Sequence, residues 1–274
     1  YNSLRYYGQP SEQDLANARF LLHLPEVESF NPVKRLSVAD AKQAFLEGME
    51  AYGFKGKVQV STKIVADAMV VNAEQKVLIR KGATFRPKEL QYLVHHEIGV
   101  HMVTTMNARL QPLKLLRIGT AMSTKTQEGL AVLSEYLSGN TTLRRLKELA
   151  ARVVAVDMMV RGADFVETYR HLTTQVQMKP DDAWTLTTRV YRGGGFTKDH
   201  LYLQGFREVV TLWKSGADLS PLLIGKTSMA HYESLSELIQ RGVLDAPTYR
   251  TMPIMIPQIE KNDPIFEYIV KGIQ

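Results

Sequence analysis

Three of the seven histidines lie in one short segment, HHEIGVH, which holds His95, His96 and His101 with Glu97 among them. Histidine is the commonest metal ligand in proteins, and a glutamate next to a ligand histidine can deprotonate a metal-bound water. A single histidine on an apolar helix is more often a packed core residue. The density of this cluster favours a metal site, with His95 either packing or supporting a ligand.

The spacing of His96 and His101 is one residue longer than in the HExxH pattern of zinc peptidases. On a regular α-helix a spacing of four leaves two side chains within about 40°, whereas a spacing of five separates them by about 140°. Rings that far apart cannot bind one ion. A π-type turn absorbs one extra residue, and Gly99 makes a local distortion easier. The motif therefore predicts a bulge or kink between His96 and His101.

A zinc site that hydrolyses its substrate needs a third protein ligand and leaves a position for water. The next expected helix carries Glu128 and Glu135, which lie seven residues apart and therefore within about 20° on one face. One can bind the metal while the other supports a ligand histidine. Glu128 in a first helical turn also suits the helix dipole, and Glu135 could simply face solvent. The spacing alone leaves this choice open.

The elements that would position these residues are a small sheet and many helices. Residues 1–55 are predicted to be mostly helical, with one helix after Ser11 and another from Val38 to about Tyr52, which Ser37 caps and Gly53 ends. Strand-like patterns follow at 58–60, 69–71 and 77–79, the last two as a hairpin. The histidine motif falls on a helix from Glu89 to about Asn107. Further helices are predicted at 125–138, 141–161, 163–177, 181–191, 198–214, 229–241 and 263–272.

This order of elements predicts an α+β protein with a single compact domain over residues 1–274. Within it we expect a helical lead-in (1–55), a core with the metal motifs (56–140) and a helical part (141–274).

Composition narrows the functional classes. Apolar residues make up 45% and charged residues 23% of the 274 residues, which excludes a disordered, collagen-like or coiled-coil chain. The absence of cysteine excludes disulfides and thiol chemistry. We see no membrane span and no signal peptide, and expect a cytoplasmic protein. The net charge of +6 favours acidic partners, but the basic residues are too scattered for a nucleic-acid site.

Two motifs together resemble a known family. His96–His101 (HEIGVH), followed by Gln127–Ala131 (QEGLA), resembles the bacterial QEGLA-motif family, first described as flavohaemoglobin expression modulators. That family is similar to the animal tubulin tyrosine carboxypeptidases. A third matching stretch is FTKDHLYLQG, Phe196–Gly205, and the resemblance covers most of the chain. It implies a zincin-like core, zinc bound by His96, His101 and Glu128, and Glu97 as general base.

Peptide hydrolysis also needs a donor for the oxyanion, and a carboxypeptidase needs a cation for the terminal carboxylate. Tyr202 and His200 are suitable donor types, although each residue by itself is more often simply a helix-surface residue. Three cations could bind the carboxylate, and the sequence does not choose among Arg189, Arg192 and Lys198. The triplet Gly193–Gly195 is more typical of a loop than of a phosphate site. We expect an extended substrate to pair with an edge strand beside the catalytic helix, at Val77–Arg80.

These residues predict a zinc-dependent carboxypeptidase that acts on peptide or protein C-termini. In this mechanism Glu97 takes a proton from the zinc-activated water and passes it to the leaving amine. An endopeptidase or aminopeptidase on the same site is an alternative, as is a regulatory or scaffold protein with a non-catalytic metal. A structural zinc normally has four protein ligands and no neighbouring base, so the pattern favours an open, catalytic site. The expected partner is a peptide tail, acidic if the net charge guides it.

Overall fold

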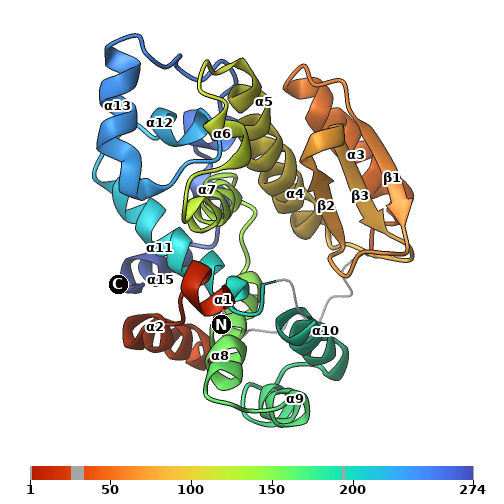
Figure 1. Cartoon of the computed structure of the whole chain (residues 1–274). Helices are drawn as coiled ribbons and strands as arrows, with labels where there is room; N and C mark the ends of the chain where they lie inside the picture. The colour runs from red at the N-terminus through yellow and green to blue at the C-terminus, as the bar shows by residue number, and fades with distance from the viewer. Residues whose placement is uncertain (1, 26–33, 193–194, 274) are drawn as a thin grey trace.

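The computed structural model of the chain describes residues 2–25, 34–192 and 195–273. It is mostly helical with a small three-stranded sheet, so the predicted α+β class is confirmed (Figure 1). The elements are α1 (Asn2–Tyr7), α2 (Glu12–His23), α3 (Val38–Ala51), β1 (Lys57–Ser61), β2 (Ala68–Val71), η1 (Asn72–Glu74), β3 (Lys76–Arg80), α4 (Pro87–His96), η2 (Glu97–Met102), α5 (Val103–Leu110), α6 (Leu115–Ile118), α7 (Ser123–Leu137), α8 (Leu143–Val160), α9 (Phe165–Thr174), α10 (Pro180–Tyr191), η3 (Lys198–His200), α11 (Leu201–Lys214), α12 (Ser220–Leu223), η4 (Met229–His231), α13 (Tyr232–Gln240), α14 (Met252–Met255), η5 (Ile259–Lys261) and α15 (Ile265–Gly272).

The predicted helices are found close to their expected bounds. Ser37 caps α3 through its hydroxyl, which accepts the backbone N–H of Asp40, and Asp40 in turn accepts the N–H of Ser37. Two expected helices, at 198–214 and 229–241, begin with a 3₁₀ turn before α11 and α13. None of the helices in the described part of the chain is long and apolar enough to cross a membrane.

The sheet has the order β1-β3-β2. Strand β3 pairs parallel with β1 and antiparallel with β2, and the latter pairing confirms the expected hairpin. The prediction that Val77–Arg80 forms an edge is wrong, because β3 has a partner on both sides. Among the described strands, the edges of the sheet are β1 and β2. Alternate residues of β3, Val77 and Ile79, are fully buried. They pack in one apolar cluster with Phe45 of α3 and Leu90 of α4.

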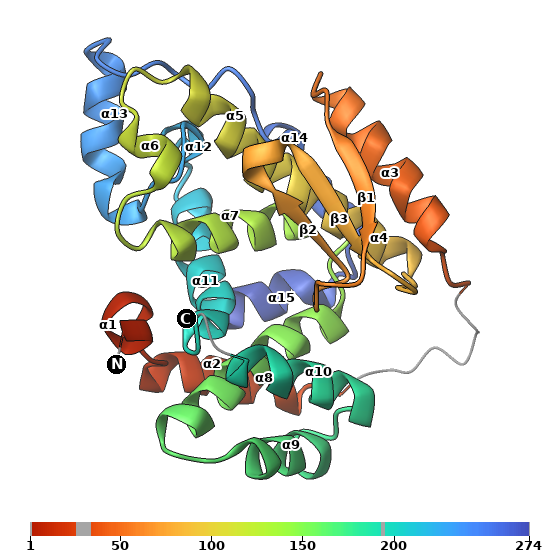
Figure 2. The same cartoon turned by 45° about the vertical axis from the view of Figure 1, so that its right-hand side comes forward.

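Helix α7 lies at the centre of the molecule, and 13 of its 15 residues are buried. It packs against α4 and η2 on one side and against α11 on the other (Figures 1 and 2). A Cβ atom added to Gly129 would lie 2.3 Å from the carbonyl oxygen of Gly205. The two helices therefore cross with their backbones in contact, which only glycine permits at this point. The glycine of the QEGLA motif thus sets the distance between α7 and α11.

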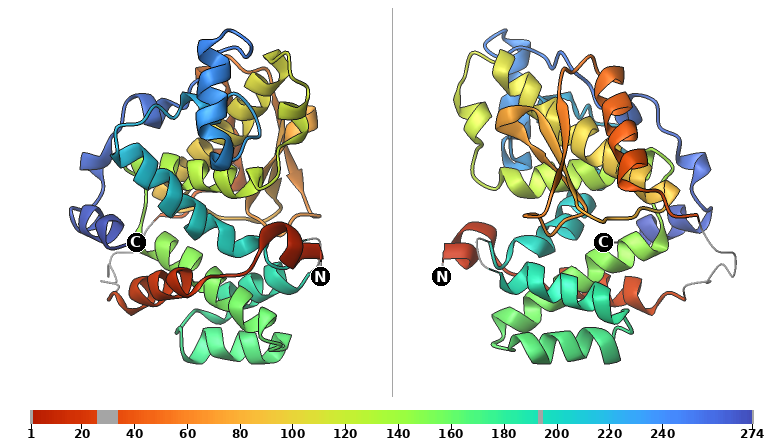
Figure 3. Two further views of the ribbon diagram at one scale, coloured as in Figure 1. Left: turned by 60° about the vertical axis from the view of Figure 1, so that its left-hand side comes forward. Right: turned by 90° about the vertical axis from the view of Figure 1, so that its right-hand side faces the viewer.

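A cleft of about 2000 Å³ separates the sheet and α4 from the helices α8 and α10. Figure 3 shows these two parts above and below the level of α7, with α2 and α9 packed around α8. The cleft is lined from above by Val70 of β2 and by Glu97, and from below by Arg145 and Arg189. The histidine motif lies in this lining.

Candidate metal centre

The backbone is deformed where the spacing of the histidines requires it. Between α4 and α5, residues Glu97–Met102 form a π-helix, which confirms the predicted bulge. A π turn closes hydrogen bonds five residues apart, so it brings side chains at a spacing of five onto one face. The rings of His96 and His101 consequently lie 4.9 Å apart, centroid to centroid. The Thr251 hydroxyl donates to the carbonyl of Gly99 at 2.6 Å and so binds a carbonyl of the widened turn.

His96, His101 and Glu128 form a group whose ligand atoms all lie within 4.8 Å of one another. Oε2 of Glu128 is 3.5 Å from Nε2 of His96 and 3.5 Å from Nε2 of His101. This oxygen is buried and has no hydrogen-bond partner among the described residues. Buried acceptors without a partner are uncommon in folded proteins. Two imidazole nitrogens and one carboxylate oxygen that face one another in this way fit a divalent metal ion such as zinc.

The second oxygen of Glu128 is bound by Lys198. Its Oε1 lies 3.1 Å from Nζ of Lys198, so Oε2 is the oxygen that faces the histidines. Burial alone would raise the pKa of Glu128, but the charges of Lys198 and His101 outweigh it and hold the pKa well below its usual range. The structure thus places Lys198, expected to bind substrate, beside a candidate metal ligand.

Glu135 contacts the opposite side of His96. Its Oε1 lies 2.7 Å from Nδ1 of His96, and the carboxylate accepts two hydrogen bonds from Arg145, at 3.0 and 2.9 Å. The side chain is fully buried. With Nδ1 directed at Glu135, Nε2 of His96 is directed at Glu128. Of the two glutamates that the spacing left open, Glu128 faces both histidines and Glu135 supports one of them.

The electrostatics of His96 follow from these neighbours. Burial would lower the pKa of His96, but the carboxylates of Glu128 and Glu135 outweigh it and raise the pKa to about 9. For Glu135, burial would raise the pKa, and Arg145 and His96 outweigh it and lower the pKa. Glu128 and Glu135 therefore place negative charge on opposite sides of His96, and this charge favours binding of a cation by His96 and Glu128.

Glu97 lies at the start of the π turn and lines the cleft. Its Oε2 accepts the backbone N–H of Val70 at 2.9 Å. Strand β2 is an edge of the sheet, so this N–H points away from β3 and toward the histidine motif. The edge of the sheet thus orients the expected general base.

The structure brings Tyr202 to the centre but not His200. The ring of Tyr202 is stacked at 6.4 Å and 17° on the ring of His96, and Tyr202 lines the cleft. Burial raises the pKa of the Tyr202 hydroxyl, which keeps it protonated. His200 is 1% exposed, lies outside the cleft lining, and its Nδ1 is 2.5 Å from the carbonyl of Thr197.

The other predicted cations line the same cleft. Arg189 binds Asp199 through two nitrogens, at 3.0 and 3.1 Å, so its guanidinium is already paired. Arg192 is exposed at the end of α10, next to Gly193–Gly194, a part of the glycine triplet outside the described residues. His95 does not line the cleft, and burial lowers its pKa, as expected for a packing residue.

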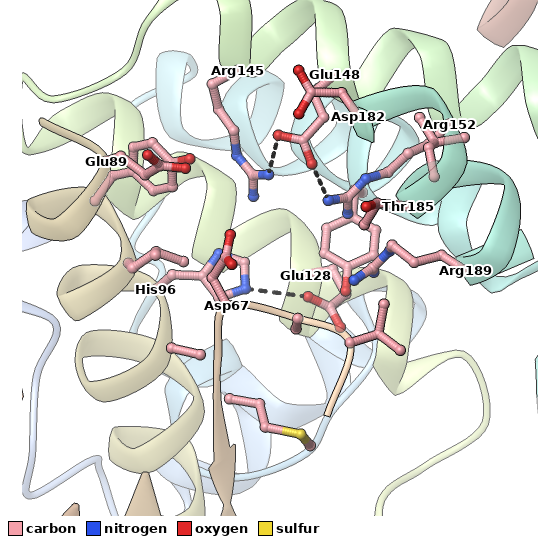
Figure 4. Close-up of a pocket in the computed structure, with 18 of the residues that line it drawn as sticks. Asp67, Glu89, His96, Glu128, Arg145, Glu148, Arg152, Asp182, Thr185 and Arg189 are labelled. Carbon is pink, nitrogen blue, oxygen red and sulfur yellow. Dashed lines mark hydrogen bonds and ion pairs between the residues drawn. The ribbon is translucent and has the colours of Figure 1, made fainter. Parts of the chain in front are cut away.

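Sequence reasoning missed the charged face of α8. Arg145, Glu148 and Arg152 all line the cleft, and Glu148 pairs with both arginines, at 3.3 and 2.5 Å (Figure 4). Their spacing of three and four residues places them on one side of the helix. That spacing was a signal, but a charged helix face is usually solvated, and nothing in the sequence shows that this one faces the metal motif.

A family model described as microtubule-associated tyrosine carboxypeptidase matches residues 1–274, the whole chain. No curated protein matches it. The match confirms the resemblance to tyrosine carboxypeptidases that the HExxxH and QEGLA motifs indicated.

Proposed function

The chain belongs to the microtubule-associated tyrosine carboxypeptidase family, and from this premise we propose that it is a zinc-dependent carboxypeptidase. The family implies a carboxypeptidase-like peptidase with a peptide or protein substrate. Zinc dependence is supported by one observation above all. The buried Oε2 of Glu128 has no hydrogen-bond partner among the described residues and faces Nε2 of both His96 and His101. Around it we propose a zincin-like core in a single-domain chain.

In this proposal His96, His101 and Glu128 hold the ion. Zinc with three protein ligands lowers the pKa of a bound water to near 7 and polarises a carbonyl. Glu97 acts as the general base, because the Val70 N–H fixes one carboxylate oxygen and the other can take a proton. The same carboxylate then returns the proton to the leaving amine.

Tyr202 is our candidate for the oxyanion donor. Burial raises the pKa of its hydroxyl, so the phenol stays protonated and can donate a hydrogen bond. Its ring is held between the ring of His96 and the guanidinium of Arg152, which lies 4.7 Å from the ring centroid. A donor fixed in this way needs little reorganisation when charge develops on the substrate oxygen.

The cleft favours an acidic substrate tail. Among the described residues that line it are thirteen Lys or Arg and seven Asp or Glu, an excess of six positive charges, of which Arg145 and Arg189 are paired with Glu135 and Asp199 outside the lining. The whole chain carries the same net charge of +6, so the remaining sequence is balanced. The positive electrostatic field of this lining attracts an acidic peptide and orients it before it binds. Strand β2, the edge beside the π turn, is the strand along which an extended peptide would lie.

The test combines metal content with peptide cleavage. We expect about one zinc per chain and release of the terminal residue from N-acetylated peptides, but not from their C-terminal amides. Glu97→Gln should keep the metal and lose at least about 100-fold in kcat. His101→Ala should lose the metal. Glu233→Gln, on the exposed surface of α13, is the matched control. Full activity of Glu97→Gln would contradict the mechanism.

A further inference from the structure

Arg152 of α8 is a buried cation whose hydrogen bonds are incomplete. The residue is 5% exposed and lines the cleft. Its Nη2 donates to Oε1 of Glu148 at 2.5 Å, but its Nε is buried without a hydrogen-bond partner among the described residues. A buried donor that lacks a partner is destabilising unless a ligand or water supplies one. Arg152 therefore has donors to offer to an anion that enters the cleft.

Three other cations near the metal motif are committed to buried carboxylates. Arg145 binds Glu135 through two nitrogens, and Arg189 binds Asp199 in the same way. Lys198 binds Glu128. Diverting Arg189 to a substrate would leave Asp199 buried without its cation, and diverting Arg145 or Lys198 would remove from Glu135 or Glu128 the cation that balances its charge, which is unfavourable. The three carboxylates are at most 7% exposed.

Glu148 differs from those carboxylates, because it can release Arg152 without being left alone. Its side chain is 38% exposed and it also pairs with Nη1 of Arg145, at 3.3 Å. If an incoming carboxylate replaces it on Arg152, Glu148 stays bonded to Arg145 and hydrated. The exchange conserves the number of charge pairs and gives Nε of Arg152 a partner.

Arg152 also lies at a suitable place relative to the metal centre. Its guanidinium carbon is 4.7 Å from the centroid of the Tyr202 ring, and that ring is stacked on His96. A single aromatic ring thus connects the arginine with a candidate metal ligand. Figure 4 shows Arg145, Arg152 and Arg189 gathered across the cleft from His96.

We propose that Arg152 binds the terminal α-carboxylate of the substrate and so makes this site an exopeptidase. The inference rests on the proposed function, and it selects a residue outside the three cations that the sequence indicated. A guanidinium matches a carboxylate with two parallel hydrogen bonds, which a peptide amide cannot reproduce. Arg152 is then the residue that distinguishes a free C-terminus from an internal peptide bond.

The test measures binding without turnover. In the zinc-loaded Glu97→Gln protein, a glutamate-rich N-acetylated hexapeptide ending in tyrosine is compared with its C-terminal amide by calorimetry. We expect the free acid to bind more tightly. Adding Arg152→Met should weaken binding of the free acid at least about 30-fold and leave the affinity for the amide unchanged. Arg152→Lys keeps the positive charge but cannot form the two parallel hydrogen bonds. It should therefore regain only part of the preference for the free acid.

The controls separate this role from folding and from catalysis. Arg144→Met, on the same helix and in the same cleft, should keep the preference for the free acid. The zinc content and the midpoint of thermal unfolding show whether each variant is loaded with metal and folded. If Arg152→Met does not fold, Arg152→Lys decides the outcome. Equal binding of acid and amide by the parent, or a preference that survives both Arg152 substitutions, would overturn the proposal. The parent protein, which keeps Glu97, is also tested for peptide cleavage. If it cleaves no peptide while tighter binding of the free acid still depends on Arg152, the peptidase mechanism is refuted and the role of Arg152 in binding stands.

Discussion

Replacing Glu135 with glutamine should weaken zinc binding although Glu135 does not face the proposed metal position. Its carboxylate is fully buried and lies 2.7 Å from Nδ1 of His96. The negative charge keeps the proton on Nδ1 and makes Nε2 a better ligand. Loss of such a supporting carboxylate typically lowers metal affinity about 10- to 100-fold. We expect Glu135→Gln to fall in this range.

The same substitution should destabilise the metal-free protein. Arg145, 7% exposed, would lose its two charged acceptors on Glu135 and keep the one on Glu148, at 3.3 Å. Breaking a buried ion pair from one side costs about 3–5 kcal/mol, or a midpoint shift on the order of 10 °C in a chain of this size. Because the pKa of Glu135 is lowered from 4.5, this contribution is present above about pH 4.5 and is lost as the pH falls below it.

Competition with a chromophoric chelator measures the zinc affinity, and thermal unfolding with and without metal measures the stability. The double variant Glu135→Gln, Arg145→Met removes both charges and should recover much of the lost stability while zinc binding stays weak. Glu233→Gln is the surface control. If Glu135→Gln bound zinc as tightly as the parent, the role assigned to the Glu135–His96 contact would be refuted.

Three further outcomes follow from the geometry. Tyr202→Phe should lower kcat about 10²- to 10³-fold with zinc content unchanged, and an unaltered kcat would remove Tyr202 from the oxyanion site. Gly129→Ala places a Cβ atom 2.3 Å from the backbone of Gly205, so urea unfolding should show a loss of about 1–3 kcal/mol or more; no loss would mean that α7 and α11 cross less closely. Zinc at 100 times its Kd should stabilise the parent by about 2.7 kcal/mol, as thermal unfolding can show, whereas stabilisation that persists in His101→Ala would place the metal elsewhere.

The geometry of the histidine motif could be predicted from the sequence because its constraints are local. The spacing of five from His96 to His101 is incompatible with one ion on an α-helix, so the spacing itself required a deformed turn, and the π-helix at Glu97–Met102 is that turn. The cap expected at Ser37 also depends only on neighbouring residues, and it is present.

The features that the sequence could not provide depend on long-range pairing. Nothing near Val77–Arg80 shows that β1 pairs with one side of β3 while β2 pairs with the other, so the edge strand was assigned wrongly. Glu128 and Glu135 share one face of α7, and helical periodicity cannot separate them. The difference arises from Arg145, which approaches Glu135 from another helix, and from Lys198, which approaches Glu128 from the turn before α11.

The positive charges of the cleft fall into two groups, the cations near the metal motif and the exposed cations of the lining. The two groups act on different features of a substrate. Near the metal motif, Arg145, Arg189 and Lys198 are neutralised by the buried carboxylates that they bind, so they contribute little to the net electrostatic field. The excess comes from exposed cations of the lining, such as Lys63 and Lys88. Interactions of exposed charges are screened by salt, whereas those of buried charges are screened much less. Raising the ionic strength should therefore weaken binding of an acidic tail while the preference for a free terminal carboxylate persists.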